Sequence, residues 1–427
     1  MSTVKPDFDG TSNWLPLSGV RILEFGQIYA GPLAGLVLAD LGAEVVKIEP
    51  PSGDGMRMWP PFLEDHPQHP GHPPVSLSFS TMNRGKKSVS LDLKDPHDVE
   101  VAHALIAECD VLLENFRPGT MERLGLGFDA AAQINPGITY CSISGFGQTG
   151  PEVSSGAYDI VVQGYSGLMS VTGEDPEHPV KCGLPVADAV AGLYAALSVV
   201  AALADGSTRR RAEETPAIPS PVSPARAALY LDCSMVDSLL AISGLQLAQL
   251  FGYGSSPVPL GTAHPSNAPY QMFQALDGPF ILAAGNQNLW RKVCEILGDE
   301  LLLGDERFIT QGKRVANQRL LEESLNKQFA QASVGHWLGK FSERGVPAGP
   351  VNNFAQVVQT PHVVERGLIV PFTLECGCEG RGPIFPVKTN YPTAAIDGTH
   401  GTVPKLGADK AAVLATWLTK GEPAQHR

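Results

Sequence analysis

The chain has 427 residues, 43% of them hydrophobic, and a formal net charge of −13. This length and apolar content allow two or three domains with large cores. The acidic balance argues against a nucleic-acid scaffold or a membrane-surface protein, because both usually carry an excess of basic residues. Seven cysteines without regular spacing do not make a disulfide framework, so we expect a reducing compartment.

Strand and helix patterns alternate from Val20 onward. The expected strands read VRILEFG, EVVKIEP, SVSLDL, DVLLENF and GITYCSISGFG, and the helices between them read AGPLAGLVLADLG, which Gly42 closes, DPHDVEVAHALIAEC, and Met121 to Ile134. Repeated β-α-β units predict an α/β fold with a doubly wound, mostly parallel, Rossmann-like sheet. Such a sheet binds ligands at the carboxyl ends of its strands.

The composition divides the chain further. Residues 15–205 would form the first part of a large α/β domain, and residues 206–227, rich in charge, Pro and Ser, read as a linker. Residues 228–345 would form a smaller α+β domain. Residues 346–427 would be a return linker and the C-terminal part of the large domain.

Common catalytic motifs are missing from the sequence. The loop GQIYAG, Gly26 to Gly31, resembles a phosphate loop, but Pro32 and Leu33 stand where Lys and Ser/Thr are required. The first strand is not followed by G-x-G-x-x-G, and neither G-x-S-x-G nor H-E-x-x-H occurs.

A metal site is not indicated. Cys376 and Cys378 form a single C-x-C without a second pair. His66, His69 and His72 lie in the Pro-rich segment EDHPQHPGHPP, which is more typical of an exposed loop. The N-terminus lacks an apolar signal core and the C-terminus is not a peroxisomal address, so we expect a cytoplasmic or mitochondrial matrix protein.

One carboxylate, Asp188, stands at the start of the apolar run within PVKCGLPVADAVAGLYAALSVVAAL. Asp is a favoured residue just before a helix, where it accepts hydrogen bonds from free backbone N–H groups. The small apolar residues that follow predict a buried helix, too short to span a bilayer. Position alone therefore favours a capping role.

Basic residues concentrate in NRGKKSVSLDLK, residues 83–94. The segment contains one acidic residue, Asp92, and four basic residues, Arg84, Lys86, Lys87 and Lys94. This patch could be a solvated surface or a seat for a phosphorylated ligand, and the sequence leaves both open.

Several segments together resemble the class III CoA-transferase family, which contains formyl-CoA transferase, carnitine CoA-transferase and α-methylacyl-CoA racemase. The likeness is carried by LSGVRILEFGQIYAGPLAGLVLADLGAEVVKIEPPSGD, NRGKKSVSLDLKDP, LLENFRPGTMERLGLG, INPGITYCSISGFGQTGP, GAYDIVVQGYSGLMSVTG and PVADAVAGLYAAL. Weaker likeness continues through APYQMFQALDG and ERGVPAGPVNN, so the resemblance covers nearly the whole chain.

The resemblance implies a catalytic role for Asp188. Asp188 occupies the position of the family's nucleophile, and Tyr158 and Asp159 in GAYDIV fall where the family approaches the thioester and the reacting acid. Capping and catalysis can coexist, because a helix start favours an ionised carboxylate and attack requires one.

The same resemblance implies where CoA binds. CoA would rest on the turn from Leu91 to Lys94, with further contacts from Asn115, Phe116, Arg117 and Arg123 and weaker candidates in Tyr29 and Ala30. Pro50 replaces an Arg that often contacts CoA in relatives, so Arg57 or the Arg84 cluster would supply that affinity. We expect CoA thioesters as substrates, no tightly bound cofactor, no nucleic-acid or membrane partner, and an interlocked homodimer.

Departures from the family pattern reduce the number of activities that we expect. The racemase branch uses a His where this chain has Tyr158, whose phenol is poorly suited to a proton relay at neutral pH. The segment GTAHPSNAPYQMF replaces the glycine-rich lid of formyl-CoA transferases and resembles the succinyl-CoA:glutarate branch. We therefore expect CoA transfer from succinyl-CoA to a short dicarboxylic acid such as glutarate or itaconate. The alternatives are α-methylacyl-CoA racemase and a non-catalytic CoA-binding protein.

Overall fold

The computed structural model describes residues 15–214, 227–389 and 401–418, except for residues 65–72. The predicted loop around His66, His69 and His72 lies outside the described residues. The chain forms two compact units, which are described separately below. The larger comprises Met1–Ser166, Cys182–Leu245 and Val364–Arg427, and the smaller comprises Gly167–Lys181 and Gln246–Val363.

A six-stranded sheet forms the centre of the large unit, and every strand pair in it is parallel. Its order is β5-β2-β1-β6-β7-β8. The strands are β1 (Arg21–Glu24), β2 (Glu44–Glu49), β5 (Lys87–Ser90), β6 (Val111–Glu114), β7 (Thr139–Ser144) and β8 (Leu229–Ser234). This order confirms the predicted doubly wound fold, and its direction reverses between the neighbouring strands β1 and β6.

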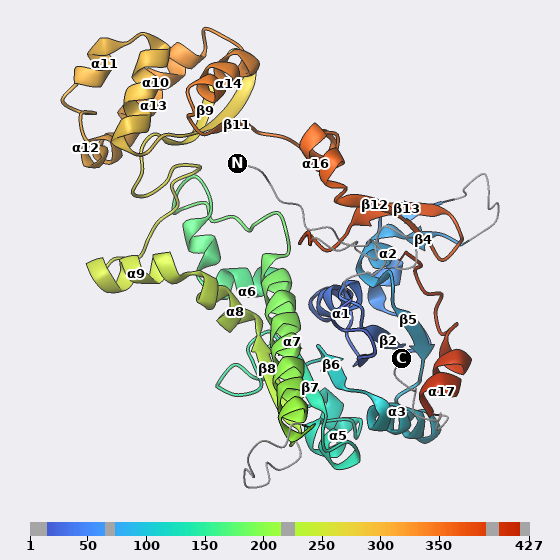
Figure 1. Ribbon diagram of the computed structural model, residues 1–427. Helices are drawn as coiled ribbons and strands as arrows, with labels where there is room; N and C mark the ends of the chain where they lie inside the picture. Colours follow the sequence, from blue (N-terminus) through green and yellow to red (C-terminus); the bar gives the residue numbers. More distant parts are fainter. Residues whose placement is uncertain (1–14, 65–72, 215–226, 390–400, 419–427) are drawn as a thin grey trace. The chain divides into compact units, whose positions relative to one another are not determined.

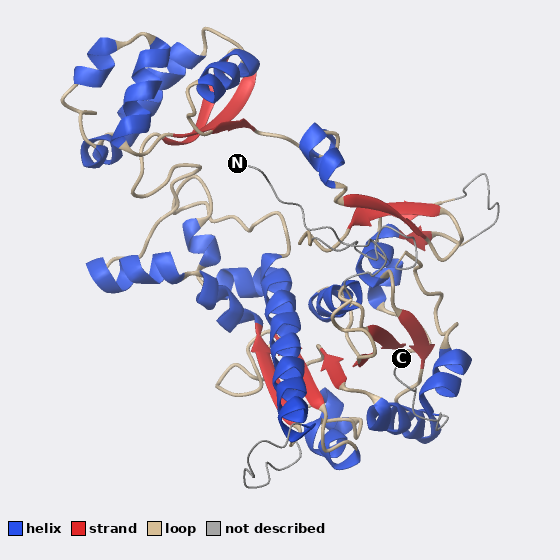
Figure 2. Cartoon of the chain, viewed as in Figure 1, coloured by secondary structure: helices blue, strands red, loops and turns tan. Residues whose placement is uncertain are grey.

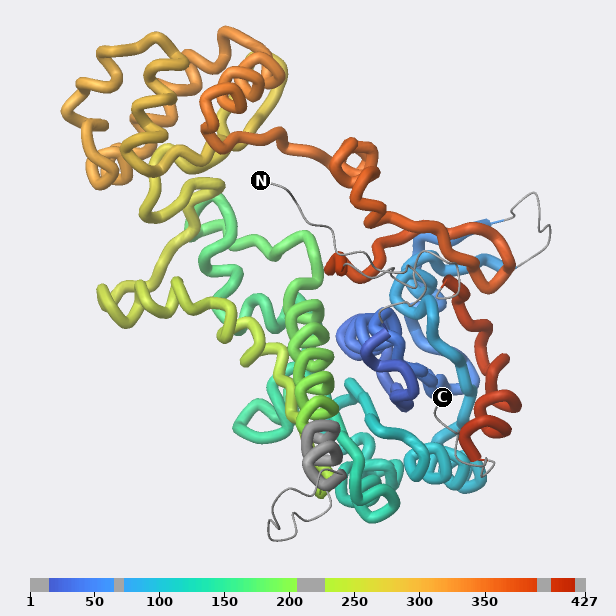
Figure 3. Tube along the Cα trace, in the orientation of Figure 1, coloured from blue at the N-terminus to red at the C-terminus, as the bar shows by residue number. Residues whose placement is uncertain are grey.

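Helices cover both faces of this sheet (Figures 1 and 2). On one face, α1 (Ala30–Asp40) packs against α7 (Val186–Glu214). On the other, α3 (Pro96–Glu108), α5 (Phe128–Ile134) and α17 (Lys410–Leu418) enclose a core that contains Leu105, Ala131 and Trp417. Figure 3 shows the C-terminal α17, in red, beside α3.

Shorter elements complete the large unit. They are the helices α2 (Leu77–Asn83), α4 (Thr120–Arg123), α6 (Asp159–Tyr165) and α8 (Met235–Ile242), the 3-10 helix η1 (Gly55–Met58), and the antiparallel pairs β3 (Phe62–Leu63) with β4 (Val75–Ser76) and β12 (Ile369–Thr373) with β13 (Glu379–Pro383). The single helix expected from Met121 to Ile134 is two helices, α4 and α5. Gly125, which lies between them at φ +72°, accounts for the break.

The small unit is α+β. Its antiparallel sheet has the order β11-β10-β9, with strands β9 (Tyr270–Ala275), β10 (Gly278–Ala283) and β11 (Ala348–Pro350). Phe280, Trp290 and Phe329 anchor its core. The helices are η2 (Leu168–Val171), α9 (Gly244–Tyr253), α10 (Gln287–Leu297), α11 (Glu300–Gly304), α12 (Gln311–Ala316), α13 (Gln318–Phe329), α14 (Val334–Glu343), α15 (Phe354–Val357) and α16 (Pro361–Arg366), of which α9 and α16 cross the unit boundaries.

The unit boundaries differ from the predicted ones. The 206–227 segment does not join two domains, because α7 continues to Glu214 and β8 then pairs with β7 in the large sheet. The second segment of the small unit therefore begins at Gln246 instead of residue 228, and its first segment, Gly167–Lys181, falls within the range predicted for the large domain. The end of the small unit also lies later than residue 345, because β11 pairs with β10.

Helix α7 is longer and more exposed than expected. Its segment Val186–Asp205 is long and apolar enough to cross a membrane by length and composition, and only 39% of that segment is buried. One side packs on α1, β7 and β8, whereas Leu193 and Leu197 on the same helix are 52% and 62% exposed. The expectation of a buried helix too short to span a bilayer was wrong in length, and the helix is buried on one face only.

Candidate active site

Two loops meet where the sheet reverses direction. The loop after β1 contains Gln27, and the loop after β6 contains Asn115. The side chain of Asn115 accepts a hydrogen bond from the Gln27 N–H at 2.7 Å and donates to the Gln27 carbonyl at 2.9 Å. This two-point bond joins the loops at the position where doubly wound sheets bind ligands.

The loop after β1 is strained. Ile28 has φ +64° and is the only residue other than glycine with positive φ in the described part of the chain. A β-branched side chain is disfavoured there, at a cost of about 1–3 kcal/mol. Ile28 donates its N–H to both carboxylate oxygens of Asp54 at 3.2 Å, which helps to hold the conformation. Tyr29 follows directly and precedes α1.

A second helix, α7, starts close to α1. A Cβ atom added at Gly192 of α7 would lie 2.7 Å from the carbonyl oxygen of Ala30, at the start of α1. Only glycine therefore allows this approach. The result is that Tyr29, before α1, and Asp188, in the first turn of α7, belong to one site.

Asp159 caps α7, a role predicted for Asp188. One Asp159 oxygen accepts the Ala187 N–H at 2.8 Å, and the other accepts a hydrogen bond from Gln163 Nε2 at 2.6 Å. Buried Gln163 in turn accepts the N–H of Cys182 at 2.8 Å. Asp188 is the third residue of the helix and not its cap, so the capping prediction was wrong for Asp188.

The charge state of Asp188 also differs from the expectation. Burial raises the pKa of Asp188 to about 7, and the negative charge of Asp159 contributes to the rise. The helix start alone would have favoured ionisation. Desolvation therefore outweighs the helix dipole, and a fraction of Asp188 is protonated at neutral pH.

Tyr29 is held in its neutral form. Burial raises its pKa above the usual value of a phenol, and the charges of Asp188 and Asp159 raise it further. A neutral phenol can donate a hydrogen bond to an anionic oxygen. Tyr158 contrasts with Tyr29, because it is 73% exposed at the start of α6.

The residues predicted to bind CoA differ in the exposure of their side chains. Lys94, Arg117 and Arg123 are exposed on loops and a helix that follow the carboxyl ends of β5 and β6. Leu91 and Ala30 are buried, so only their backbones are available to a ligand. Phe116 is half-buried and packs against the core. Asn115 uses its side chain to hold the loop after β1.

The basic cluster is largely structural. Arg84 forms two bonds to Asp40, at 2.6 and 2.7 Å, and Lys87 pairs with Glu44. Lys86 is buried against Glu24 at 2.8 Å. Burial lowers the pKa of Lys86 to about 8. Arg84 and Lys86 are buried in these ion pairs, so the phosphate-seat interpretation was wrong for both, whereas Lys94 and Lys87, whose side chain is 41% exposed, remain candidates.

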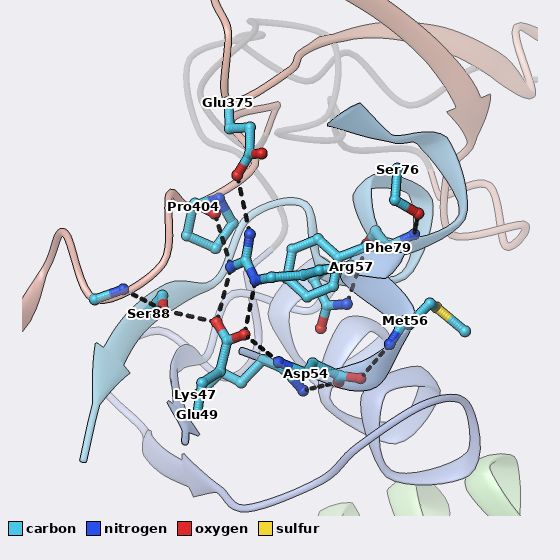
Figure 4. A network of polar contacts seen from close by, with 12 residues as sticks. Lys47, Glu49, Asp54, Met56, Arg57, Ser76, Phe79, Ser88, Glu375 and Pro404 are labelled. Carbon is cyan, nitrogen blue, oxygen red and sulfur yellow. Dashed lines mark hydrogen bonds and ion pairs between the residues drawn. The ribbon is translucent and has the colours of Figure 1, made fainter. Parts of the chain in front are cut away.

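Arg57 is similarly engaged (Figure 4). It donates to Glu49 at 2.8 Å and to Glu375 at 2.9 Å, and its guanidinium lies 3.7 Å from the centre of the Phe79 ring. The hypothesis that Arg57 compensates for Pro50 in CoA binding is therefore not supported by its surroundings.

Sequence reasoning missed Lys47 and Asp54, which contact the loop before Tyr29. A signal was present in EVVKIE, where Lys47 and Glu49 interrupt an otherwise apolar buried strand. A charged residue inside a fully covered strand needs a partner. That requirement predicts a buried ion pair.

A cavity of about 350 Å³ lies elsewhere in the large unit, lined by residues of α7, β8 and α8 that include Tyr194, Asp232 and Asp237. Asp188 does not line it. The cavity is therefore separate from the site built around the two helix starts.

Comparisons with known proteins agree on one family. The family model described as CoA-transferase family III matches residues 17–410. A succinate–glutarate CoA-transferase of Agrobacterium fabrum is 35% identical over 94% of this chain and 95% of the relative. An acetyl-CoA:oxalate CoA-transferase of Acetobacter aceti is 35% identical over 83% of this chain and 85% of the relative. The crystal structure of a CAIB/BAIF family protein from Brucella suis is 34% identical, with a TM-score of 0.79 over 94% of this chain and 99% of that one.

Proposed function

Since the chain belongs to CoA-transferase family III, we propose that it transfers CoA from succinyl-CoA to a short dicarboxylic acid, with glutarate and itaconate as first candidates. The two relatives described above are named for glutarate and oxalate, both dicarboxylates. The observation that carries the proposal is the half-buried carboxylate of Asp188, with its raised pKa, beside neutral Tyr29.

In the proposed first half-reaction, ionised Asp188 attacks the thioester carbonyl of succinyl-CoA. The carbon–sulfur bond breaks and gives an aspartyl–succinyl anhydride and CoA thiolate. The thiolate then attacks the aspartyl carbonyl and expels succinate. The product is a thioester between Asp188 and CoA, and no ATP is required because each step exchanges groups of similar reactivity.

The second half-reaction reverses this order. The carboxylate of the acceptor attacks the aspartyl-CoA thioester, which forms a new anhydride and releases CoA thiolate. The thiolate attacks the acyl carbonyl of the acceptor. This step forms the new acyl-CoA and regenerates the Asp188 carboxylate.

The local electrostatics suit this chemistry. A carboxylate with a pKa near 7 is a stronger nucleophile than an ordinary one, yet part of it is ionised at neutral pH. In the proposal, Tyr29 donates to the oxyanion that forms on the attacked carbonyl, because its phenol stays protonated. Asp159 orients the start of α7, and exposed Tyr158 approaches the acyl group.

We assign CoA binding to the exposed cations Lys94, Arg117 and Arg123 and to the backbone from Leu91 to Lys94. Cationic side chains form charge-assisted hydrogen bonds to phosphate oxygens. Charge reversal at one of these residues should raise KM for the CoA thioester more than it lowers kcat.

We also infer a homodimer. The exposed apolar side chains of α7 and α8, including Leu193, Leu197 and Ile242, form a surface that water would not favour. Light scattering in solution should give about twice the chain mass of 45.3 kDa, and Leu197→Asp should lower it. A stable monomer would contradict this inference.

A chromatographic assay tests the proposed function. Succinyl-CoA is incubated with a panel of mono- and dicarboxylic acids of two to six carbons, with wild-type chain and with Asp188→Ala. We expect a new acyl-CoA with a dicarboxylic acceptor in the wild type and none in the variant. Mass spectrometry of peptides from enzyme and succinyl-CoA alone should find CoA attached to Asp188.

Other results of this assay would indicate a different acceptor or a different reaction. Transfer only to monocarboxylic acids would retain the family activity and reject the dicarboxylate. Absence of transfer, with exchange of the α-proton of a 2-methylacyl-CoA in heavy water, would instead indicate the racemase reaction.

A further inference from the structure

Side chains hold three successive backbone units of the strained loop before Tyr29. Lys47 Nζ donates to the carbonyl oxygen of Gly26 at 2.5 Å. Asn115 binds both the N–H and the carbonyl of Gln27. Asp54 accepts the N–H of Ile28. The loop therefore has a separate support at each unit.

Lys47 and Asp54 are themselves paired and fully buried. Their ammonium and carboxylate atoms are 2.9 Å apart, and the side chains of both are 0% exposed. Lys47 also contacts Glu24 at 3.1 Å, so its three donor hydrogens have three acceptors: Glu24, Asp54 and the Gly26 carbonyl. Burial by itself would lower the pKa of Lys47, but the charges of Glu24 and Asp54 outweigh it and raise the pKa.

Asp54 is fixed from its other side by a second layer of contacts (Figure 4). Its N–H donates to Glu49 at 2.9 Å, and one of its oxygens accepts the N–H of Met56 at 2.9 Å. Arg57 donates to Glu49 and to Glu375, and within the described residues Glu375 forms no hydrogen bond or ion pair with Gly26 to Ile28. The network thus has an inner end at the loop and an outer end at Glu375.

Structural stability alone does not require this arrangement. A buried pair of charges could stabilise the sheet without touching the Gly26–Tyr29 loop. Here one charge binds Gly26, two residues before the strained position, and the other binds the strained residue Ile28 itself. The loop conformation in turn sets the place of Tyr29 relative to Asp188.

We propose that Lys47 and Asp54 are positioning residues that hold Gly26 to Ile28 in the conformation that places the Tyr29 phenol beside Asp188. The inference rests on the proposed function, in which Asp188 is the nucleophile. Loss of either support lets Ile28 relax to negative φ and moves Tyr29 away from the reacting carbonyl.

The central test compares Asp54→Asn with Glu375→Gln. Both replace a carboxylate of the same network by its isosteric amide, but only Asp54 contacts the loop. We expect Asp54→Asn to lower kcat on the order of 100-fold, with KM for the CoA thioester little changed, because a misplaced group costs rate more than binding. Glu375→Gln should keep kcat close to the wild-type value. Equal losses in the two variants, or an unchanged kcat in Asp54→Asn, would overturn the proposal.

A rescue variant examines the cause of the loss. Glycine adopts positive φ at no steric cost, so adding Ile28→Gly to Asp54→Asn should recover part of kcat. If the double variant is no more active than Asp54→Asn, backbone strain at Ile28 is not the link, and the proposal fails in this form.

Two further measurements apply if Asp54→Asn does not fold or if the wild-type chain shows no transfer. If Asp54→Asn does not fold, Ile28→Pro breaks the loop directly, because proline requires φ near −65° and has no N–H for Asp54. It should lower kcat to a similar extent, and a wild-type kcat would overturn the proposal.

If the wild-type chain transfers CoA to no acid, the proposed function fails independently of this inference. Amide hydrogen exchange then tests the loop alone. Exchange at Gln27 to Tyr29 should be faster in Asp54→Asn than in Glu375→Gln, and equal exchange would reject the positioning role.

Discussion

The starts of α1 and α7 lie together in the site but are stabilised in opposite ways. Tyr29, before α1, makes no capping hydrogen bond with its side chain, and the strained loop ahead of it is held by buried ions. The start of α7 has a cap, Asp159, and carries Asp188 with its raised pKa in the same turn. The difference teaches that a buried carboxylate with cationic and N–H partners, such as Asp54, serves as support. Asp188, whose pKa is raised by burial and by the neighbouring carboxylate of Asp159, is the group that we propose to react.

The largest effect is expected from removing the proposed nucleophile, Asp188, at the start of α7. Asp188→Asn keeps the size of the side chain but deletes the proposed nucleophile, so kcat should fall on the order of 10⁴-fold or more, as for other covalent catalysts. Thioester exchange kinetics measure it, and mass spectrometry should find no CoA adduct. Tyr29→Phe, which removes only the hydroxyl group, should lower kcat far less. A comparable loss of kcat in Tyr29→Phe would contradict the assignment of Asp188 as the nucleophile and of Tyr29 as a hydrogen-bond donor.

The next effect concerns the close approach between the starts of α1 and α7. Gly192→Ala would place a Cβ 2.7 Å from the Ala30 carbonyl, so we expect a loss of about 1–3 kcal/mol in unfolding free energy and reduced kcat. The matched control is Gly339→Ala, at an exposed position of α14 where a Cβ meets no atom within 4 Å. That substitution should stabilise by up to about 1 kcal/mol because alanine is the better helix former. Equal changes in melting temperature would show that the close approach is not required.

A smaller effect concerns the cap. Asp159→Asn can still accept the Ala187 N–H, but it removes a negative charge that raises the pKa of Asp188. Because the proposed attack requires ionised Asp188, wild-type activity should rise with pH through about 7. In the variant this rise should move to lower pH, so that the ratio of rates at pH 6 and pH 8 increases about three- to ten-fold. An unmoved pH profile would assign the raised pKa to burial alone.

The smallest effect is on stability. The folded-state pKa of Asp188 lies above its unfolded value, so its protonated form stabilises the fold at low pH, and this contribution is lost as pH rises from about 4 through about 7. Asp188→Asn stays neutral and should be more stable than wild type at pH 8, with little difference at pH 4. Because the site is partly exposed, we expect a gain of only about 1–2 kcal/mol, measured by denaturant unfolding.

Much of the fold follows from local patterns. Apolar runs such as RILE and VLLE predicted parallel strands, and Tyr29 and Asn115 lie in the loops after them. The domain boundaries were harder, because β8 belongs to the large sheet only through pairing with β7, a strand about 90 residues earlier. No local pattern encodes such a pairing.

The sequence by itself determined the alternating β-α order, the family motifs and the position of Asp188. These depend on residue types and short spacings that the chain carries wherever it folds. Tertiary structure alone decided that Asp159 caps α7, that Lys86 and Arg57 are held by carboxylates and that Lys47 and Asp54 support Ile28. The physical reason is that hydrogen bonds, desolvation and ion pairing depend on distances between groups, and those distances exist only once separate strands and helices have packed together.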